Sequence, residues 1–185
     1  MGALAVGSEV IIKELLCSPA RRSLGSMPEA DALTEADALQ EAALVDLCTD
    51  AIGGRVELLF DLRTALQFRM ADTAVLVVNG VTRFELDRTP QKAARRVGTP
   101  YVMSSVPTTD GDWLELQLVC LGGWSVRVRG RGAEFYVGNV VGLPEAPPNF
   151  VEDDDATVAR GMQSWSSDFD AEWATFVEPV DGGYL

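Results

Sequence analysis

The sequence predicts an α+β fold, an antiparallel β-meander that is curled or packed on a second hairpin, with helices at the N- and C-terminal ends. Apolar and polar residues alternate with a period of two over 56–70 and over 114–129, which is typical of half-buried strands. Glycine-containing turn signals separate these segments. Helical spacing and alanine-rich composition are found near the two ends of the chain.

The length of 185 residues, with 47% hydrophobic residues, fits one domain with a sizeable core. We divide it into an N-terminal helical region (1–42), an antiparallel β core (43–141), a linker (142–151) and a C-terminal helical region (152–178).

The N-terminal region is expected to hold helices because Ser8 can cap the segment that follows it, and because 29–42 is rich in good helix formers. The next segment, 43–50, has two readings. As a strand, it would pair Leu47 with Leu58 across a four-residue loop; as a helix, it would present an apolar stripe that ends near Gly53. We favour the strand.

The central strands are predicted from alternation and turn chemistry. The even positions from Val56 to Met70 are mostly apolar, so a turn at 71–72 would bring the next strand back on the same face. Asn79-Gly80 is a strong signal for a two-residue type I′ turn, and pairing across it would set Val75 beside Phe84.

A second hairpin follows at 113–129. A three-residue loop over 122–124 keeps apolar side chains on one face by pairing Cys120 with Val126, so we predict that loop. The segment 133–137 is expected to form one further strand.

Beyond the linker, apolar residues recur at spacings of 4, 3, 4, 4 and 3, which predicts one or two amphipathic helices before Pro179. The residues of this stripe are Val158, Met162, Trp165, Phe169, Trp173 and Phe176.

Composition excludes several classes of function. The sequence contains no histidine, which rules out Ser-His-Asp and Cys-His catalytic systems and imidazole metal sites. The three cysteines, Cys17, Cys48 and Cys120, form no CxxC pair and are interpreted as core residues. The N-terminal segment resembles neither a signal peptide nor a membrane span, so a cytoplasmic location is expected.

Charge is strongly uneven along the chain. Residues 1–54 carry 9 acids and 3 bases, residues 55–144 carry 9 and 11, and residues 145–185 carry 10 and 1. An acidic surface disfavours nucleic acid and anionic membranes and attracts a cationic partner.

The candidate site lies in this acidic C-terminal region. Asp153 is a natural N-cap, so the simplest role of the four consecutive carboxylates is to start a helix. Their spacing lacks the pattern of a calcium loop, so neither a metal nor a cofactor is expected. Carboxylates beside aromatic rings also suit the binding of lysine and arginine side chains. The candidate partner-binding residues are Glu152, Asp153, Asp154, Asp155, Trp165, Asp168, Asp170, Glu172 and Trp173.

Two other groups of charged residues have simpler explanations. Arg127, Arg129 and Arg131 could hold phosphate, but the proposed register sets Arg131 opposite Glu115 and Arg129 opposite Gln117, on a solvated outer face. Asp110 and Asp112 match ordinary turn chemistry.

In size, acidity, fold class and lack of catalytic groups, the chain resembles small acidic bacterial immunity-type proteins. That resemblance implies a protein that neutralises a partner toxin. Our leading hypothesis is a non-catalytic module whose acidic surface binds a basic protein. The alternative is a small-molecule-binding or enzymatic domain with a pocket between the sheet and the end helices.

Overall fold

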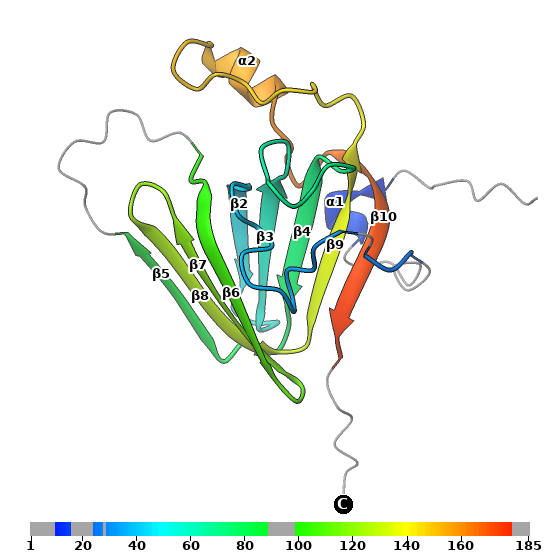
Figure 1. Cartoon of the computed structure of the whole chain (residues 1–185), viewed down its shortest axis with the longest axis vertical. Coiled ribbons are helices and arrows are strands. Elements are labelled where there is room, and N and C mark those ends of the chain that lie inside the picture. Colours follow the sequence, from blue (N-terminus) through cyan, green and yellow to red (C-terminus); the bar gives the residue numbers. More distant parts are fainter. Residues whose placement is uncertain (1–9, 16–23, 28, 89–98, 179–185) are drawn as a thin grey trace, which may run out of the picture.

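The computed structural model describes residues 10–15, 24–27, 29–88 and 99–178, which are dominated by two antiparallel β-sheets. The large sheet has the strand order β1-β10-β9-β4-β3-β2, and the small sheet has the order β5-β8-β7-β6. The sheets lie closest at one end and diverge toward the other, where α2 lies (Figure 1). The strands of the large sheet are β1 (Val10–Ile11), β2 (Ala43–Asp50), β3 (Arg55–Asp61), β4 (Thr73–Val78), β9 (Ala133–Val140) and β10 (Asp168–Val177). Those of the small sheet are β5 (Arg83–Arg88), β6 (Val102–Asp110), β7 (Trp113–Cys120) and β8 (Trp124–Arg131).

The predicted antiparallel sheet structure is confirmed, whereas the helical ends are not. The helices of the described residues are α1 (Ile12–Leu15) and α2 (Asp155–Arg160). None of the described helices is long and apolar enough to cross a bilayer.

Two strands continue from one sheet into the other at the end where the sheets lie closest. β4 continues through Asn79-Gly80 into β5, and β8 continues through Gly132 into β9, so a long two-stranded ribbon bends between the sheets. Gly80 has φ of 56°, which suits a residue without a side chain. The predicted hairpin turn at Asn79-Gly80 is therefore wrong, because β5 pairs with β8 and not with β4.

The main core lies between the sheets and uses the alternation that the sequence shows. Leu58, Leu76, Phe135, Leu116 and Val128 are fully buried there. The side chains on the opposite face of the large sheet are also buried, in a second hydrophobic cluster. Its buried members are Ile12, Leu59, Val75, Val77, Tyr136, Val140, Phe169 and Ala174. The predicted half-buried strands, with one face on the core and one face in solvent, are therefore found in the small sheet. In the large sheet, β4 is buried along its whole length.

The strand predicted over 56–70 ends at Asp61, and residues 62–72 form a loop before β4. Leu62 and Phe68 of this loop insert into the main core, which explains why their spacing imitates a strand. The predicted turn at 71–72, with Phe68 opposite Val75, is wrong for this reason.

The segment 43–50 is a strand, as predicted, and its four-residue loop pairs Leu47 with Leu58. The β7–β8 hairpin has the predicted three-residue loop, but the loop occupies 121–123, so Leu118 faces Val126. The faces are as predicted although the register is shifted by two residues. The strand predicted at 133–137 is also present, within β9.

The segment 29–42 consists of turns instead of the predicted helix. Asp37 and Glu41 have φ of 59° and 64°, values that a continuous right-handed helix does not allow. Asp37 is held by β6, because its amide donates to the Ser105 carbonyl and its carboxylate accepts from Ser104 Oγ at 2.8 Å. Tertiary hydrogen bonds therefore override helix propensity here. The predicted Ser8 cap lies outside the described residues.

The C-terminal helical stripe is also wrong beyond α2, because Phe169, Trp173 and Phe176 lie on β10. β10 pairs with β9 along its length, with a bulge between Ala171 and Trp173. An extra residue in a strand changes its side-chain period locally, which lets a strand imitate helical spacing.

Candidate functional site

The four consecutive carboxylates begin α2, one residue later than predicted. Asp154, and not Asp153, is the N-cap, and its Oδ1 accepts from the Thr157 amide at 2.7 Å. Those hydrogen bonds hold the pKa of the exposed Asp154 carboxyl below its usual value. Asn149 donates to both of the acids that precede Asp154: its amide N–H donates to the Asp153 carboxylate at 2.7 Å, and its Nδ2 donates to the Glu152 carboxylate at 3.0 Å. The local hydrogen bonds fix the acidic loop while Glu152, Asp154 and Asp155 stay exposed.

A buried arginine fastens this acidic segment to the large sheet. Arg63 forms a two-point ion pair with Asp61, through Nε at 2.9 Å and Nη2 at 2.7 Å, and the side chains of both residues are 3% exposed. Its Nη1 donates to the carbonyls of Pro144 and Ala146, and its Nη2 also donates to the Gly161 carbonyl at 2.8 Å. Arg63 thus holds the linker before α2 and the residue that ends α2. Sequence reasoning missed this role, because Arg63 occupied a position taken to be solvent-facing.

The other predicted partner-binding residues lie on or next to β10, so the set is divided between two elements. Asp168 and Glu172 are exposed, Asp170 is half-buried, and the Glu172 carboxylate accepts from Asn139 Nδ2 at 2.9 Å. The two tryptophans are half-buried. Trp165 Nε1 donates to Asp46 Oδ2 at 2.9 Å, and Trp173 packs against the main core.

The charged face of the small sheet has the composition that the sequence predicts. Arg127 lies within 3.7 Å of the Glu115 carboxylate and donates to Gln117. Sequence reasoning missed Trp113, whose ring lies 5.0 Å and 4.8 Å from the guanidinium carbons of Arg129 and Arg131. Neighbouring side chains therefore contact all three arginines, on a face of the small sheet that is open to solvent. Asp110 ends β6 and Asp112 lies in the two-residue turn before β7, in agreement with the predicted turn.

The thiols of the described chain are poor nucleophiles. Cys120 is a buried core residue, as predicted, and burial raises the pKa of its thiol to about 11. Burial also raises the pKa of Cys48, and Cys17 lies outside the described residues. Among the residues that the structure describes, no three Cys, Asp or Glu side chains converge as ligands for a metal.

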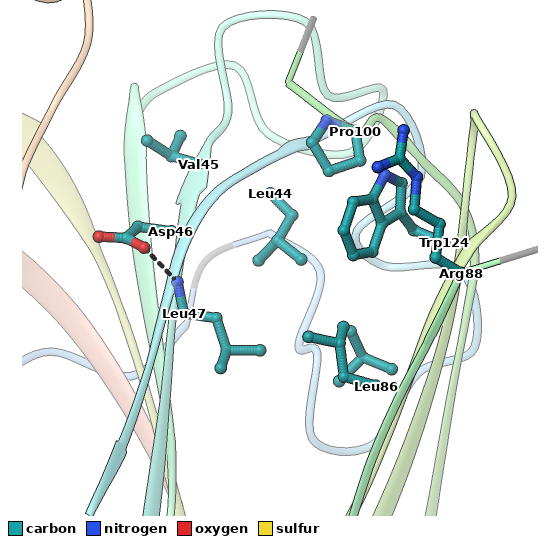
Figure 2. A pocket seen from close by; sticks show the side chains of 9 residues that line it. Leu44, Val45, Asp46, Leu47, Leu86, Arg88, Pro100 and Trp124 are labelled. Atoms are coloured by element: carbon teal, nitrogen blue, oxygen red, sulfur yellow. Dashed lines mark hydrogen bonds between the residues drawn. The ribbon is translucent and has the colours of Figure 1, made fainter. Parts of the chain in front are cut away.

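A cleft of about 320 Å³ opens between the two sheets, at the end where they diverge (Figure 2). The sequence-based alternative placed a pocket between the sheet and the end helices; this cleft lies instead between edge strands β2 and β5. Its lining consists of Leu44, Val45, Asp46, Leu47, Leu86, Arg88, Pro100, Trp124 and Val126. The Arg88 guanidinium lies 4.8 Å from the centre of the Trp124 ring. No sequence signal joins these residues, because they come from four separate segments of the chain.

Comparison with known proteins adds no functional assignment. No family model matches the chain, and no curated protein matches it. One solved structure with partial likeness is described as an uncharacterized protein from Neisseria gonorrhoeae. It has 12% sequence identity and a TM-score of 0.39, with coverage of 52% of this chain and 90% of that one.

Proposed function

We propose that this chain is a non-catalytic, cytoplasmic protein-binding module that docks a basic protein through the acidic segment at the start of α2. The observation that carries the proposal is the presentation of that segment. Glu152, Asp154 and Asp155 project from a loop that Arg63 and Asn149 hold in place. A preorganised loop loses little conformational entropy when it binds a partner.

The charge balance of the surrounding segment supports a cationic partner. Residues 142–178 contain nine acids and a single base, Arg160. The Arg160 side chain donates to the Ala156 carbonyl and to Thr157 Oγ1 at the C-terminal end of α2. An excess of negative charge of this kind speeds the encounter with a positively charged surface and orients it.

An apolar contact is available beside the carboxylates. The Val151 side chain is 82% exposed, directly before Glu152. Val151 is therefore an exposed apolar residue beside the carboxylates, whereas Trp165 and Trp173 are half-buried. Asp168, Asp170 and Glu172 of β10 would then extend the negative surface at the rim. A toxin-neutralising protein of the immunity type is one module with this design.

The proposal is tested by reversing two exposed charges; Glu152→Lys removes the hydrogen bond from Asn149 Nδ2, but Asn149 N still donates to Asp153. Glu152→Lys with Asp155→Lys keeps the Asp154 cap and the Asp153 hydrogen bond. Asp87→Lys with Asp110→Lys makes the same change of net charge on exposed residues of the small sheet, and serves as the matched control. Each protein is immobilised and exposed to a lysate of the native host.

We expect a basic protein to be retained by the wild type and by the control pair, and to be lost by the α2 pair. With that protein purified, its association rate with the wild type should fall as salt rises, because added ions screen exposed charges. Equal retention by all three proteins would refute docking at α2, and so would an association rate that does not depend on salt.

A further inference from the structure

The lining of the inter-sheet cleft is apolar because β2 contains a bulge. Leu44 pairs with Phe60, but the next pairs are Asp46 with Leu59 and Leu47 with Leu58, so one residue is extra. Without it, alternation from Leu44 would direct Asp46 into the cleft. With it, Leu44 and Leu47 both contact the inter-sheet core.

The displaced carboxylate of Asp46 is engaged elsewhere. Its Oδ1 accepts from the Leu47 amide at 2.8 Å and its Oδ2 accepts from Trp165 Nε1 at 2.9 Å. Figure 2 shows the carboxylate turned away from Leu44 and Leu86. The bulge therefore removes the acidic group of the lining from the interior of the cleft.

The opposite wall changes from apolar to cationic toward the solvent. On β5, Leu86 pairs with Val126 and Arg88 pairs with Trp124, so these four residues share the inner face of the small sheet. Leu86 is 46% exposed, which leaves apolar surface in contact with water. Arg88 is exposed, and no carboxylate of the described part of the chain forms an ion pair with it.

We propose that this cleft binds a medium-chain aliphatic monocarboxylate. The leucines of β2 and β5 would cover the hydrocarbon chain, since apolar walls with one or two placed polar groups are typical of small-molecule sites. The carboxylate would meet the Arg88 guanidinium at the mouth, where the Trp124 ring supports it. A volume of about 320 Å³ is at the small end of the range for ligand pockets, which favours a single short chain.

The charge distribution decides between possible head groups. An ammonium head would meet the Arg88 cation, and a neutral head would leave it without an anionic partner. Of these three heads, only the carboxylate neutralises the guanidinium charge and can accept two parallel N–H donors from it. This site is independent of the α2 surface, so each proposal can fail without the other.

The test is isothermal titration calorimetry of the full chain with sodium decanoate, compared with decan-1-ol and decylammonium. Saturable binding of one decanoate is expected, at least about ten-fold tighter than either comparison compound, because neither of them forms an ion pair with Arg88. Decylammonium binding as tightly as decanoate would overturn the proposal, and so would the absence of saturable decanoate binding.

Two matched pairs of variants locate the site. Arg88→Gln should weaken decanoate binding by about ten-fold or more, whereas Arg83→Gln, on the same strand but outside the cleft, should not change it. Leu86→Asp should abolish binding, whereas Val119→Asp should not, although the Val119 side chain is similarly exposed at 43%. Unchanged affinity in Arg88→Gln, or an equal loss in Arg83→Gln, would show that Arg88 does not bind the carboxylate.

Discussion

Replacement of Arg63 by methionine is expected to destabilise the protein more than a typical substitution of a charged residue. Methionine keeps most of the length of the side chain but removes every donor. The Asp61 carboxylate, whose side chain is 3% exposed, would lose its two ion-pair contacts. The carbonyls of Pro144, Ala146 and Gly161 would lose their donor at the same time.

The expected magnitude follows from burial. Removing one partner of a buried ion pair typically costs about 3–5 kcal/mol, because the remaining charge has neither water nor a counterion. For a chain of this length, each kcal/mol corresponds to roughly 2–4 °C in Tm. Arg63→Met should therefore lower Tm by about 6–20 °C.

The assay is urea unfolding followed by circular dichroism, supported by thermal melting. Arg83→Met is the matched control, because Arg83 pairs with Glu85 on the surface, and its loss should leave the unfolding midpoint nearly unchanged. The double variant Asp61→Leu with Arg63→Met should recover part of the loss by removing the stranded charge. A loss below about 1 kcal/mol in Arg63→Met would refute a buried, structural ion pair.

Three further predictions test separate parts of the structure. Gly130→Ala should cost about 1–3 kcal/mol in urea unfolding, because an added Cβ would lie 2.5 Å from the Asn79 carbonyl oxygen where the ribbon bends between the sheets. Asp154→Ala should lower Tm at neutral pH. Because the folded pKa of Asp154 is lowered, its contribution is complete above the usual Asp pKa of about 3.9 and is lost as pH falls through the lowered value, so the difference in Tm between variant and wild type should vanish there. In a Cys17→Ser background, a thiol reagent should modify the half-buried Cys48 before Cys120, whose pKa is raised to about 11. Equal rates for the two thiols would contradict that order.

Local sequence patterns predict the strands well and their partners poorly. Alternation identifies β3, β7 and β8, because each has one face on the core between the sheets, whereas β2 is favoured for its pairing with β3. It fails over 62–72, where Leu62 and Phe68 fill the core from a loop. Asn79-Gly80 has suitable turn chemistry, but the long-range pairing of β5 with β8 decides its conformation.

In the candidate sites too, local features could be predicted from the sequence and long-range contacts could not. The helix start at 154 follows from local chemistry and was predicted to within one residue. The Arg63 contacts span more than eighty residues of sequence, and the cleft combines side chains from 44 to 126. Neither arrangement leaves a local pattern, so neither could be read from one sequence.

The bulges in β2 and β10 show that a broken alternation can itself be informative. In β2, regular alternation would place Asp46 inside and Leu47 outside. In β10, regular alternation from Phe169 would place Trp173 away from the core between the sheets. In each strand an acidic residue directly precedes a large apolar one, and the extra residue lets the apolar side chain reach that core. Burying an unpaired carboxylate costs more than distorting a strand, so the chain adopts the bulge. An acid-then-apolar pair that breaks the period of a strand therefore predicts a bulge, and in β2 that bulge forms the wall of the cleft.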